Sequence, residues 1–338
     1  MKRKLLLAFC PVLLVLAIKP AYGQKDFKVL KTYHIPSSGG WDYIAVGPGN
    51  NRLYVSHSTQ VNILNLATGD SVGVIPNTTG VHGIAFDRSQ NKGFTSNGRL
   101  NTVTVFDLNS NAVLAQIPAG VNPDAIMYEP YTKKIITCNG RSKDISIIDP
   151  LSYKLLDSIN VGGKPETAVS NGMGKLFVNI EDKNEIVVVN LLTRTVEAHW
   201  PLAPGEEPTG LAFDKRSNRL FAGCGNKYLA VVDASNGNLI KTLPIGDGCD
   251  GAGFDPGTNN IFTSNGDGTL TVYHENANDN YVLLGNFVTM RGARTIAVDE
   301  MTHLVYLPTA EFEAADPNVP KARPKMISGT FQVLVVGQ

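Results

Sequence analysis

The stretch that decides the fold is Val81–Pro118, with the sequence VHGIAFDRSQNKGFTSNGRLNTVTVFDLNSNAVLAQIP. It contains four short runs of β-forming residues, GIAF, KGFTS, TVTVFDL and AVLAQIP. The residues between the runs include Asp, Asn, Gly and Ser, which supply the side-chain hydrogen bonds and positive φ angles that tight turns need. The stretch therefore predicts one four-stranded β-sheet.

The same pattern recurs along the chain with a period near 42 residues. Seven copies of four short strands are typical of a propeller. The sequence therefore predicts an all-β protein, a seven-bladed β-propeller of four-stranded antiparallel blades. The blades start near WDYIAV at Trp41, VHGIAF at Val81, PDAIMY at Pro123, PETAVS at Pro165, PTGLAF at Pro208, CDGAGF at Cys249 and ARTIAV at Ala293. The second strands are expected at 52–57, 92–97, 134–139, 175–180, 219–224, 260–265 and 304–309.

The two ends of the repeat array complement each other. The last copy ends after its third strand, FQVLVVGQ, and an unassigned fourth strand, FKVLKTYHIP, precedes the first copy at 27–36. An open ring would leave unpaired strand edges, which soluble proteins avoid. We therefore expect the N-terminal strand to complete the last blade, and residues 24–338 to form a single propeller.

The first 23 residues have the features of a signal peptide. A basic segment, MKRK, precedes an apolar run at Leu5–Ile18 that is short for a bilayer span, and Ala21-Tyr22-Gly23 offers small residues for cleavage. These features predict an exported protein, periplasmic or secreted, with no transmembrane segment after cleavage. We expect the mature protein to be a monomer.

The composition is that of a globular protein, with 43% hydrophobic and 18% charged residues. The chain has 30 basic and 30 acidic residues; without the four basic residues of 1–23 the balance is 26 − 30 = −4. This charge argues against a nucleic-acid partner. Three cysteines remain after cleavage, so at least one thiol is unpaired within the chain. Cys224 and Cys249 are expected on the same face of adjacent blades, where they could form a disulfide or stay as separate thiols.

The second and third strands resemble the YVTN repeat. The stretches that carry the resemblance are LYVSHSTQVNILNLATG, KGFTSNGRLNTVTVFDLNSN and KIITCNGRSKDISIIDP. The whole mature chain is similar to the exported YncE-like seven-bladed propellers. This resemblance implies the propeller fold and admits several functions, because such propellers include binding proteins, surface-layer proteins and enzyme subunits.

A propeller brings the start of each first strand and the end of each second strand to one mouth of the central channel. The first-strand positions predict a polar ring there: Asp42, His82, Asp124, Glu166, Thr209, Asp250 and Arg294. The second-strand ends add His57, Asn97, Asn139 and Asn265, and Trp41 adds an aromatic wall. Asn97, Asn139 and Asn265 precede glycines, so they are also read as turn residues.

The ring predicts a site for a polar ligand, although a solvated channel lining would contain similar residues. Carboxylates in proximity raise at least one pKa, which suits proton transfer. We find no sequence motif for a defined cofactor. A divalent cation could be held by Asp42, Asp124, Glu166 or Asp250, with the imidazoles admitting a transition metal.

Blade seven carries an insertion, residues 308–330, between its second and third strands. Long loops in compact domains are often lids or binding loops, and this insertion lies on the same face as the ring. Phe312 or Met326 could cover the mouth, while Lys321, Arg323 and Lys325 could meet anionic groups. A surface excursion without function is the other interpretation.

Three hypotheses for the function follow. The first is a non-catalytic propeller that binds a small molecule, peptide or partner protein at the channel mouth. The second is an enzyme, a lactonase-like hydrolase or a metal-assisted lyase, suggested by resemblance to propellers of similar blade count. The third is single-stranded DNA binding, which some YncE-like propellers are thought to perform and which needs a basic, aromatic-lined groove.

Overall fold

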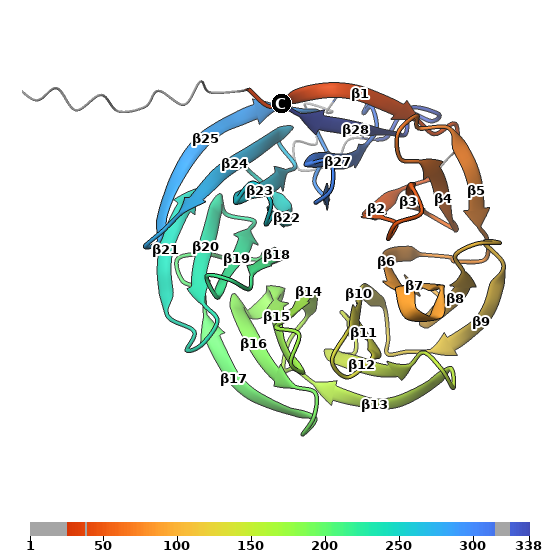
Figure 1. Cartoon of the computed structure of the whole chain (residues 1–338), viewed down its shortest axis with the longest axis horizontal. Coiled ribbons are helices and arrows are strands. Elements are labelled where there is room, and N and C mark those ends of the chain that lie inside the picture. Colours follow the sequence, from red (N-terminus) through yellow and green to blue (C-terminus); the bar gives the residue numbers. More distant parts are fainter. Residues whose placement is uncertain (1–25, 38, 315–324) are drawn as a thin grey trace, which may run out of the picture.

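A computed structural model describes residues 26–37, 39–314 and 325–338. These residues form seven four-stranded antiparallel sheets arranged as a ring around a central axis (Figure 1). The predicted fold class is therefore confirmed. The predicted signal peptide and residues 315–324 of the insertion lie outside the described residues.

The first four blades follow the chain in order, each running from an inner to an outer strand. Blade one contains β2 (Trp41–Val46), β3 (Arg52–His57), β4 (Gln60–Asn65) and β5 (Ser71–Ile75). Blade two contains β6 (Val81–Asp87), β7 (Lys92–Asn97), β8 (Thr102–Asp107) and β9 (Val113–Pro118). Blade three contains β10 (Pro123–Glu129), β11 (Lys134–Asn139), β12 (Asp144–Asp149) and β13 (Lys154–Asn160). Blade four contains β14 (Pro165–Ser170), β15 (Lys175–Ile180), β16 (Glu185–Asn190) and β17 (Thr195–Pro201).

The remaining blades continue this order and close the ring. Blade five contains β18 (Pro208–Asp214), β19 (Arg219–Cys224), β20 (Tyr228–Asp233) and β21 (Leu239–Pro244). Blade six contains β22 (Cys249–Asp255), β23 (Asn260–Asn265), β24 (Thr269–Asn276) and β25 (Asn280–Val288). Blade seven contains β26 (Ala297–Asp299), β27 (Leu304–Thr309), β28 (Gln332–Gly337) and β1 (Lys28–His34). Two short 3-10 helices, η1 (Arg88–Gln90) and η2 (Glu181–Lys183), follow strands β6 and β15.

The ring closes through its first strand, as predicted. Strand β1 pairs antiparallel with β28, from Lys28 opposite Gly337 to His34 opposite Gln332. Figure 1 shows the two strands side by side at the outer edge of blade seven. The side chains of Tyr33 and Ile35 are buried, so the closing segment contributes to the core as well as to the sheet.

Blade seven differs from the others in its innermost strand. The sequence predicts a start near Ala293, but β26 begins at Ala297 and is three residues long. Its register pairs Ala297 with Tyr306, and continuing this register places Pro308 opposite Thr295. Proline has no backbone N–H to donate to a neighbouring strand, which explains why the pairing stops there.

The hydrophobic core consists of seven clusters, each shared by two neighbouring blades. The third residue of every second strand is a large hydrophobic side chain that is fully buried between blades. Burial of such a side chain stabilises the fold by about 1.5–3 kcal/mol. These residues are Tyr54, Phe94, Ile136, Phe177, Phe221, Phe262 and Tyr306.

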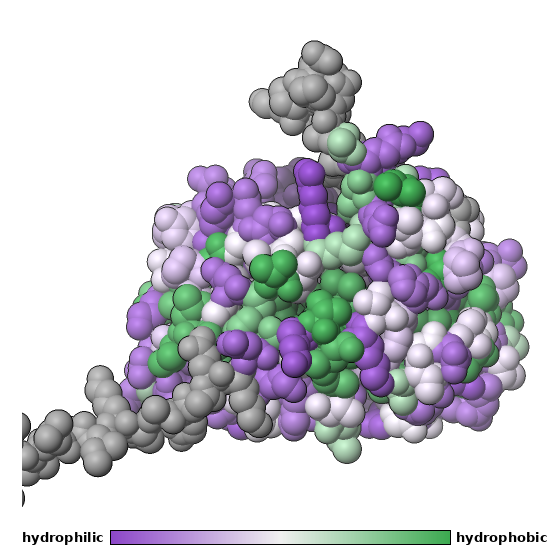
Figure 2. All heavy atoms as spheres, turned by 90° about the horizontal axis from the view of Figure 1, so that it is seen from above, coloured by the Kyte–Doolittle hydropathy of each residue, from purple (hydrophilic) through white to green (hydrophobic). Residues whose placement is uncertain are grey.

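The outer wall of the ring is mixed in character. Figure 2 views the molecule from the side and shows hydrophobic residues interspersed among hydrophilic ones. Val29 and Leu30 of β1 and Leu283 of β25 are among the exposed hydrophobic residues. Within the described part of the chain, we find no helix with the length and hydrophobicity needed to cross a membrane.

Candidate functional site

The ring residues occupy irregularities in the innermost strands. In blades one to six, the pairing of the first strand with the second shifts register directly after its first residue, for example between Trp41 and Ile44 in blade one. Such a bulge re-aims the side chains it contains and often lies beside a functional site. The residues placed in the bulges are Asp42, His82, Asp124, Glu166, Thr209 and Asp250.

Serine residues of the second strands satisfy the backbone groups that two of the bulges free. The Asp42 N–H donates to Ser56 Oγ at 2.9 Å, and the Gly83 N–H donates to Ser96 Oγ at 2.8 Å. The Ser96 hydroxyl in turn donates to the Asp124 carbonyl of the next blade. The bulges of blades one and two are therefore held by side-chain hydrogen bonds as well as by the sheet.

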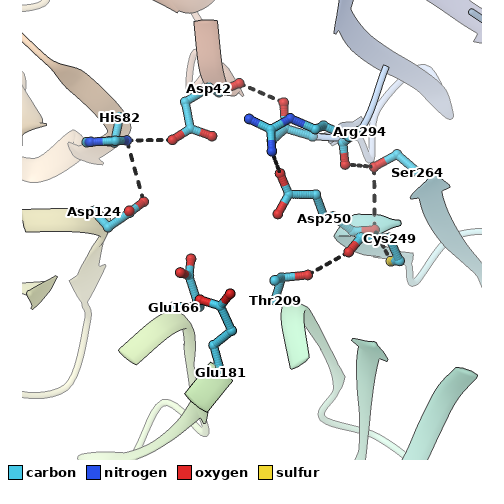
Figure 3. A network of polar contacts seen from close by, with 12 residues as sticks. Asp42, His82, Asp124, Glu166, Glu181, Thr209, Cys249, Asp250, Ser264 and Arg294 are labelled. Atoms are coloured by element: carbon cyan, nitrogen blue, oxygen red, sulfur yellow. Dashed lines mark hydrogen bonds and ion pairs between the residues drawn. The ribbon is translucent and has the colours of Figure 1, made fainter. Parts of the chain in front are cut away.

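Hydroxyl groups also connect neighbouring blades at the ring. The Thr295 hydroxyl of blade seven donates to the Asp42 carbonyl of blade one at 2.6 Å. The Thr209 hydroxyl donates to the Cys249 carbonyl at 2.8 Å, and that of Ser264 donates to the Arg294 carbonyl at 2.5 Å. Figure 3 shows these contacts around the channel. They fix the relative positions of the residues that carry charge into the mouth.

Three ring residues from blades one to three meet on one side of the channel (Figure 3). His82 Nδ1 lies 2.5 Å from Asp42 Oδ2 and 3.7 Å from Asp124 Oδ1. Burial opposes the charged imidazolium, but the hydrogen bond to Asp42 and the charge of Asp124 outweigh it and raise the pKa of His82. The His82 ring therefore lies between two carboxyl groups that favour its protonated form.

A second group lies at blade four, where sequence reasoning found Glu166 alone. Lys164 Nζ lies 2.6 Å from Glu166 Oε1 and also forms an ion pair with Glu181. Lys164 thus adds a cation to a ring in which the sequence identified Arg294 as the only formal one. The missed signal is positional. Four of the other blades have glycine in the place of Lys164, at Gly40, Gly80, Gly248 and Gly292, and four have glycine in the place of Glu181, at Gly98, Gly140, Gly225 and Gly266.

The third group joins blades six and seven. Arg294 Nη1 lies 2.7 Å from Asp250 Oδ2, and the Arg294 side chain is 41% exposed. Burial raises the pKa of Asp250, against the opposing charge of Arg294. The hydroxyl of Thr209, by contrast, is used in the hydrogen bond to the Cys249 carbonyl.

Two carboxyl groups of these clusters, those of Asp124 and Glu166, have strongly raised pKa values. Burial and the nearby charge of Asp42 raise the pKa of Asp124 to about 7, although His82 and Lys164 oppose the shift. Burial, the charge of Asp124 and a hydrogen bond that the protonated Glu166 donates to Glu181 raise the pKa of Glu166 to about 9. Asp124 therefore gains or loses its proton near neutral pH, and Glu166 does so in the alkaline range.

Next to the ring of charged residues, the side chains that line the channel are mostly apolar. Tyr43 follows Asp42 in β2, and burial together with the charges of Asp124, Glu166, Asp42 and Asp250 raises the pKa of its hydroxyl well above its usual value. Tyr43 lines a cavity of about 130 Å³ whose other walls include Ile84, Ile126 and Met127. A charged mouth thus lies next to a small hydrophobic cavity.

The side chains at the ends of the second strands do not line the channel mouth, where the sequence predicted them. The side chains of His57, Asn97, Asn139 and Asn265 are buried inside their blades. The Asn97 amide donates to Thr104 Oγ1 at 2.8 Å, and the Asn139 amide donates to Ser146 Oγ at 2.9 Å. The three asparagines face the third strand of their blade rather than the channel. His57 contacts the Gly39 carbonyl and the ring of Phe331. Burial lowers the pKa of His57.

The base of the insertion is ordered and lies beside the mouth. Phe312 pairs with Met326, and the Glu313 N–H donates to the Lys325 carbonyl at 2.8 Å. The ring centroid of Phe312 lies 6.1 Å from that of Trp41. Lys325 forms an ion pair with Glu313 at 3.9 Å, while Lys321 and Arg323 lie outside the described residues.

One group in the ring has the chemistry of a metal site. Ligand atoms of Asp42, His82 and Asp124 all lie within 4.8 Å of one another. Two carboxylates and an imidazole could hold a divalent cation. Of the four predicted metal candidates, Glu166 and Asp250 are outside this group, which is the one candidate among the described residues.

The cysteines are separate thiols. Cys138, Cys224 and Cys249 are all buried and free, so Cys224 and Cys249 do not form the disulfide that their blades would have allowed. Burial raises the pKa of Cys224 to about 12, and burial also raises the pKa values of Cys138 and Cys249. Such thiols are unreactive and serve as small core residues.

Comparisons with known protein families and with curated proteins find no match for this chain. The fold and the geometry of the channel mouth therefore carry the functional argument.

Proposed function

We propose that the protein is an exported, YncE-like propeller of the YVTN-repeat type that binds a small molecule with a cationic group at its channel mouth. The repeat stretches in the second and third strands support the family. The basic segment and apolar run of residues 1–23 support export. The propeller fold is compatible with a binding role.

The observation that carries the proposal is the charge imbalance in the mouth. Five carboxylates face the channel mouth, those of Asp42, Asp124, Glu166, Glu181 and Asp250 (Figure 3). The permanently cationic side chains that contact them are Lys164 and Arg294, and both are already paired. Partners are shared, because His82 serves both Asp42 and Asp124 and Lys164 serves both Glu166 and Glu181. Clustered carboxylates with too few cations are unfavourable. A ligand ammonium or guanidinium group would supply the missing positive charge.

The region around Asp124 and Glu166 is the best place for that group. These two carboxyls stay protonated to unusually high pH because they are buried and lie near other carboxylates. A cation between them would allow both to ionise, and the hydrophobic cavity beside Tyr43 would receive an uncharged part of the ligand. A polar mouth next to an apolar recess is typical of small-molecule sites.

Calorimetric titration with putrescine, agmatine and choline tests the proposal. At about pH 8, binding should release protons, because the entering cation lowers the carboxyl pKa values. The released protons are measured by repeating the titration in two buffers of different ionisation enthalpy. The Asp124→Asn, Glu166→Gln double variant keeps the side-chain shapes and should lose binding.

The matched control is an Asp70→Asn, Glu300→Gln variant, which changes two exposed acids away from the mouth. It should bind as the wild type does. If no cationic probe binds, or if the double variant binds unchanged, the ring is only a solvated channel lining.

A metal-assisted enzyme is the second candidate, favoured by the grouping of Asp42, His82 and Asp124. A divalent cation held by these three residues would supply a Lewis acid and activate a water molecule. His82 would then have to give up the proton it shares with Asp42. Elemental analysis after purification without chelators, followed by melting curves with and without EDTA, tests this candidate: a stoichiometric metal and a lower melting temperature in EDTA would support it.

Neither peptide binding nor single-stranded DNA binding is the preferred function. A peptide or partner protein could present the same cationic group through a lysine or an N-terminus, and the amine probes represent that chemistry. Single-stranded DNA requires a basic groove, whereas the channel mouth carries more acidic than basic side chains. Absence of oligonucleotide binding at low salt would remove this alternative.

A further inference from the structure

A second pocket adjoins the channel mouth at the junction of blades seven and one. It has a volume of about 460 Å³, which is in the range of sites for small organic ligands. Its walls come from five separate segments of the chain. The lining residues are Gly40, Trp41, Gly266, Arg291, Gly292, Arg294, Phe312 and Met326.

One side of the pocket is flat and apolar. Trp41 stacks on the buried ring of Phe331 at 5.2 Å, with 25° between the planes, and Phe312 lies on the pocket side at 6.1 Å. Phe312 is held by its backbone pairing with Met326. Gly292 allows this arrangement, since its φ is +79° and a Cβ there would lie 2.8 Å from the Phe312 ring.

The other side of the pocket is cationic. Arg294 has five N–H donors, and among the described residues Asp250 is its one ion-pair partner. Arg291 is exposed and has no ion-pair partner among the described residues, while its carbonyl is fixed by a hydrogen bond from Thr309 at 2.9 Å. None of the eight lining residues is acidic.

We propose that this pocket is a binding site for a small aromatic carboxylate. The ring of the ligand would pack against Trp41, Phe312 and Met326, and its carboxylate would accept hydrogen bonds from Arg291 and Arg294. The geometry of a guanidinium group suits a carboxylate partner, and aromatic surfaces favour flat ligands. This site goes beyond the proposed cation site, because it selects the opposite charge and uses a different wall of the mouth.

Tryptophan fluorescence of a Trp200→Phe variant tests the proposal. The chain has two tryptophans, Trp41 in the pocket and Trp200 in blade four, where Trp200 packs against Phe177. The variant therefore leaves Trp41 as the only fluorescent tryptophan. Titration with 3-phenylpropionate should change the Trp41 emission with saturation. The uncharged analogue 3-phenylpropanamide should bind roughly tenfold more weakly, and the cationic 3-phenylpropylamine more weakly still.

Arg291→Gln removes one guanidinium and should weaken 3-phenylpropionate binding by roughly threefold to tenfold. The matched control is Arg141→Gln, an exposed arginine in the turn after β11 of blade three, which should bind as the parent does. Calorimetry with the wild-type protein repeats the measurement without the Trp200 change. The Asp124→Asn, Glu166→Gln variant should still bind 3-phenylpropionate, which separates this site from the proposed cation site.

Equal affinity for the acid and its amide would overturn the proposal, as would unchanged binding by Arg291→Gln. Absence of binding by both fluorescence and calorimetry would do the same, whatever the outcome of the amine titrations.

Discussion

Nδ1 of His82 lies 2.5 Å from Oδ2 of Asp42, a residue 40 positions earlier in the chain. The contact joins equivalent positions of blades one and two, since each residue occupies the bulge of its innermost strand. Charged side chains of neighbouring blades therefore contact one another in the mouth. Several properties of the protein should depend on these contacts.

The first prediction concerns the pKa of His82. Burial alone would lower it, while Asp42 and Asp124 raise it above its ordinary value. Asp42→Asn removes the hydrogen-bonded carboxylate, so the pKa of His82 should fall. Titration of the imidazole C–H signals by NMR measures the change. His57 is the internal control, and its lowered pKa should not move.

The second prediction concerns the pH dependence of stability. The pKa values of Asp124 and Glu166 are about 7 and about 9 in the folded protein, above their ordinary values. Above about pH 4 the unfolded chain has released these protons, so folding becomes less favourable as pH rises through the folded pKa values. The size of this loss of stability also depends on the neighbouring charged groups, which are Asp42, His82, Lys164 and Asp250.

The Asp124→Asn, Glu166→Gln variant should remove this loss. The free energy of unfolding of the variant minus that of the wild type should increase by at least about 2 kcal/mol from about pH 5 to about pH 9. One pKa unit corresponds to about 1.4 kcal/mol. Urea unfolding across this range provides the measurement. Parallel pH profiles for the two proteins would contradict the pKa shifts.

The third prediction concerns the buried amide of Asn97. It donates to Thr104 Oγ1 and accepts from Thr95 Oγ1 at 2.9 Å. Asn97→Ala leaves these partners unsatisfied and should destabilise the protein by about 2 kcal/mol in urea unfolding. The exposed Asn109→Ala should change stability by less than about 0.5 kcal/mol. Ligand binding at the mouth should be unchanged in both variants.

The fourth prediction concerns ring closure. Tyr33 of β1 is 5% exposed, and its hydroxyl donates to the Leu66 carbonyl at 3.0 Å. Tyr33→Ala should destabilise the protein by about 3 kcal/mol, through lost packing at the joint between blades seven and one. Leu30→Ala, at a side chain that is 41% exposed in the same strand, is the control and should have less than half that effect. A loss for Tyr33→Ala as small as that for Leu30→Ala would show that β1 contributes little to the core.

The fifth prediction concerns the thiols. Cys138, Cys224 and Cys249 are buried and free, and burial raises their pKa values. The native mature protein should not react with Ellman's reagent, and three thiols should react after denaturation in guanidinium chloride. Addition of dithiothreitol should leave the melting temperature unchanged. A lower melting temperature with reductant would indicate a disulfide.

Much of the fold follows from local sequence. All seven second strands have the bounds that the repeat predicts, from Arg52–His57 to Leu304–Thr309. Their turns and alternating hydrophobic residues specify them without long-range information. Pairing of β1 with β28 was also predictable, because an unpaired edge on each side of the gap is unfavourable.

The site was predictable only in part. The positions of Asp42, His82, Asp124, Glu166, Asp250 and Arg294 follow from the repeat. The burial of Asn97 does not, because it depends on which way the side chain points from the end of β7 and on the hydroxyls of β8 opposite it. Lys164 and Glu181 lie one residue outside the aligned positions, so their approach to Glu166 depends on three-dimensional turn geometry.

The pairing of β1 with β28 also determines the order in which the molecule can assemble. A chain that emerges from its N-terminus presents β1 first, but the strand that must receive it, Gln332–Gly337, emerges last. Blades one to six can form as local units while the chain grows, whereas blade seven must wait for the whole chain. The buried Phe27, Tyr33 and Ile35 thus acquire their blade-seven neighbours only late in synthesis, and we expect a chaperone that protects the nascent protein to bind this first segment.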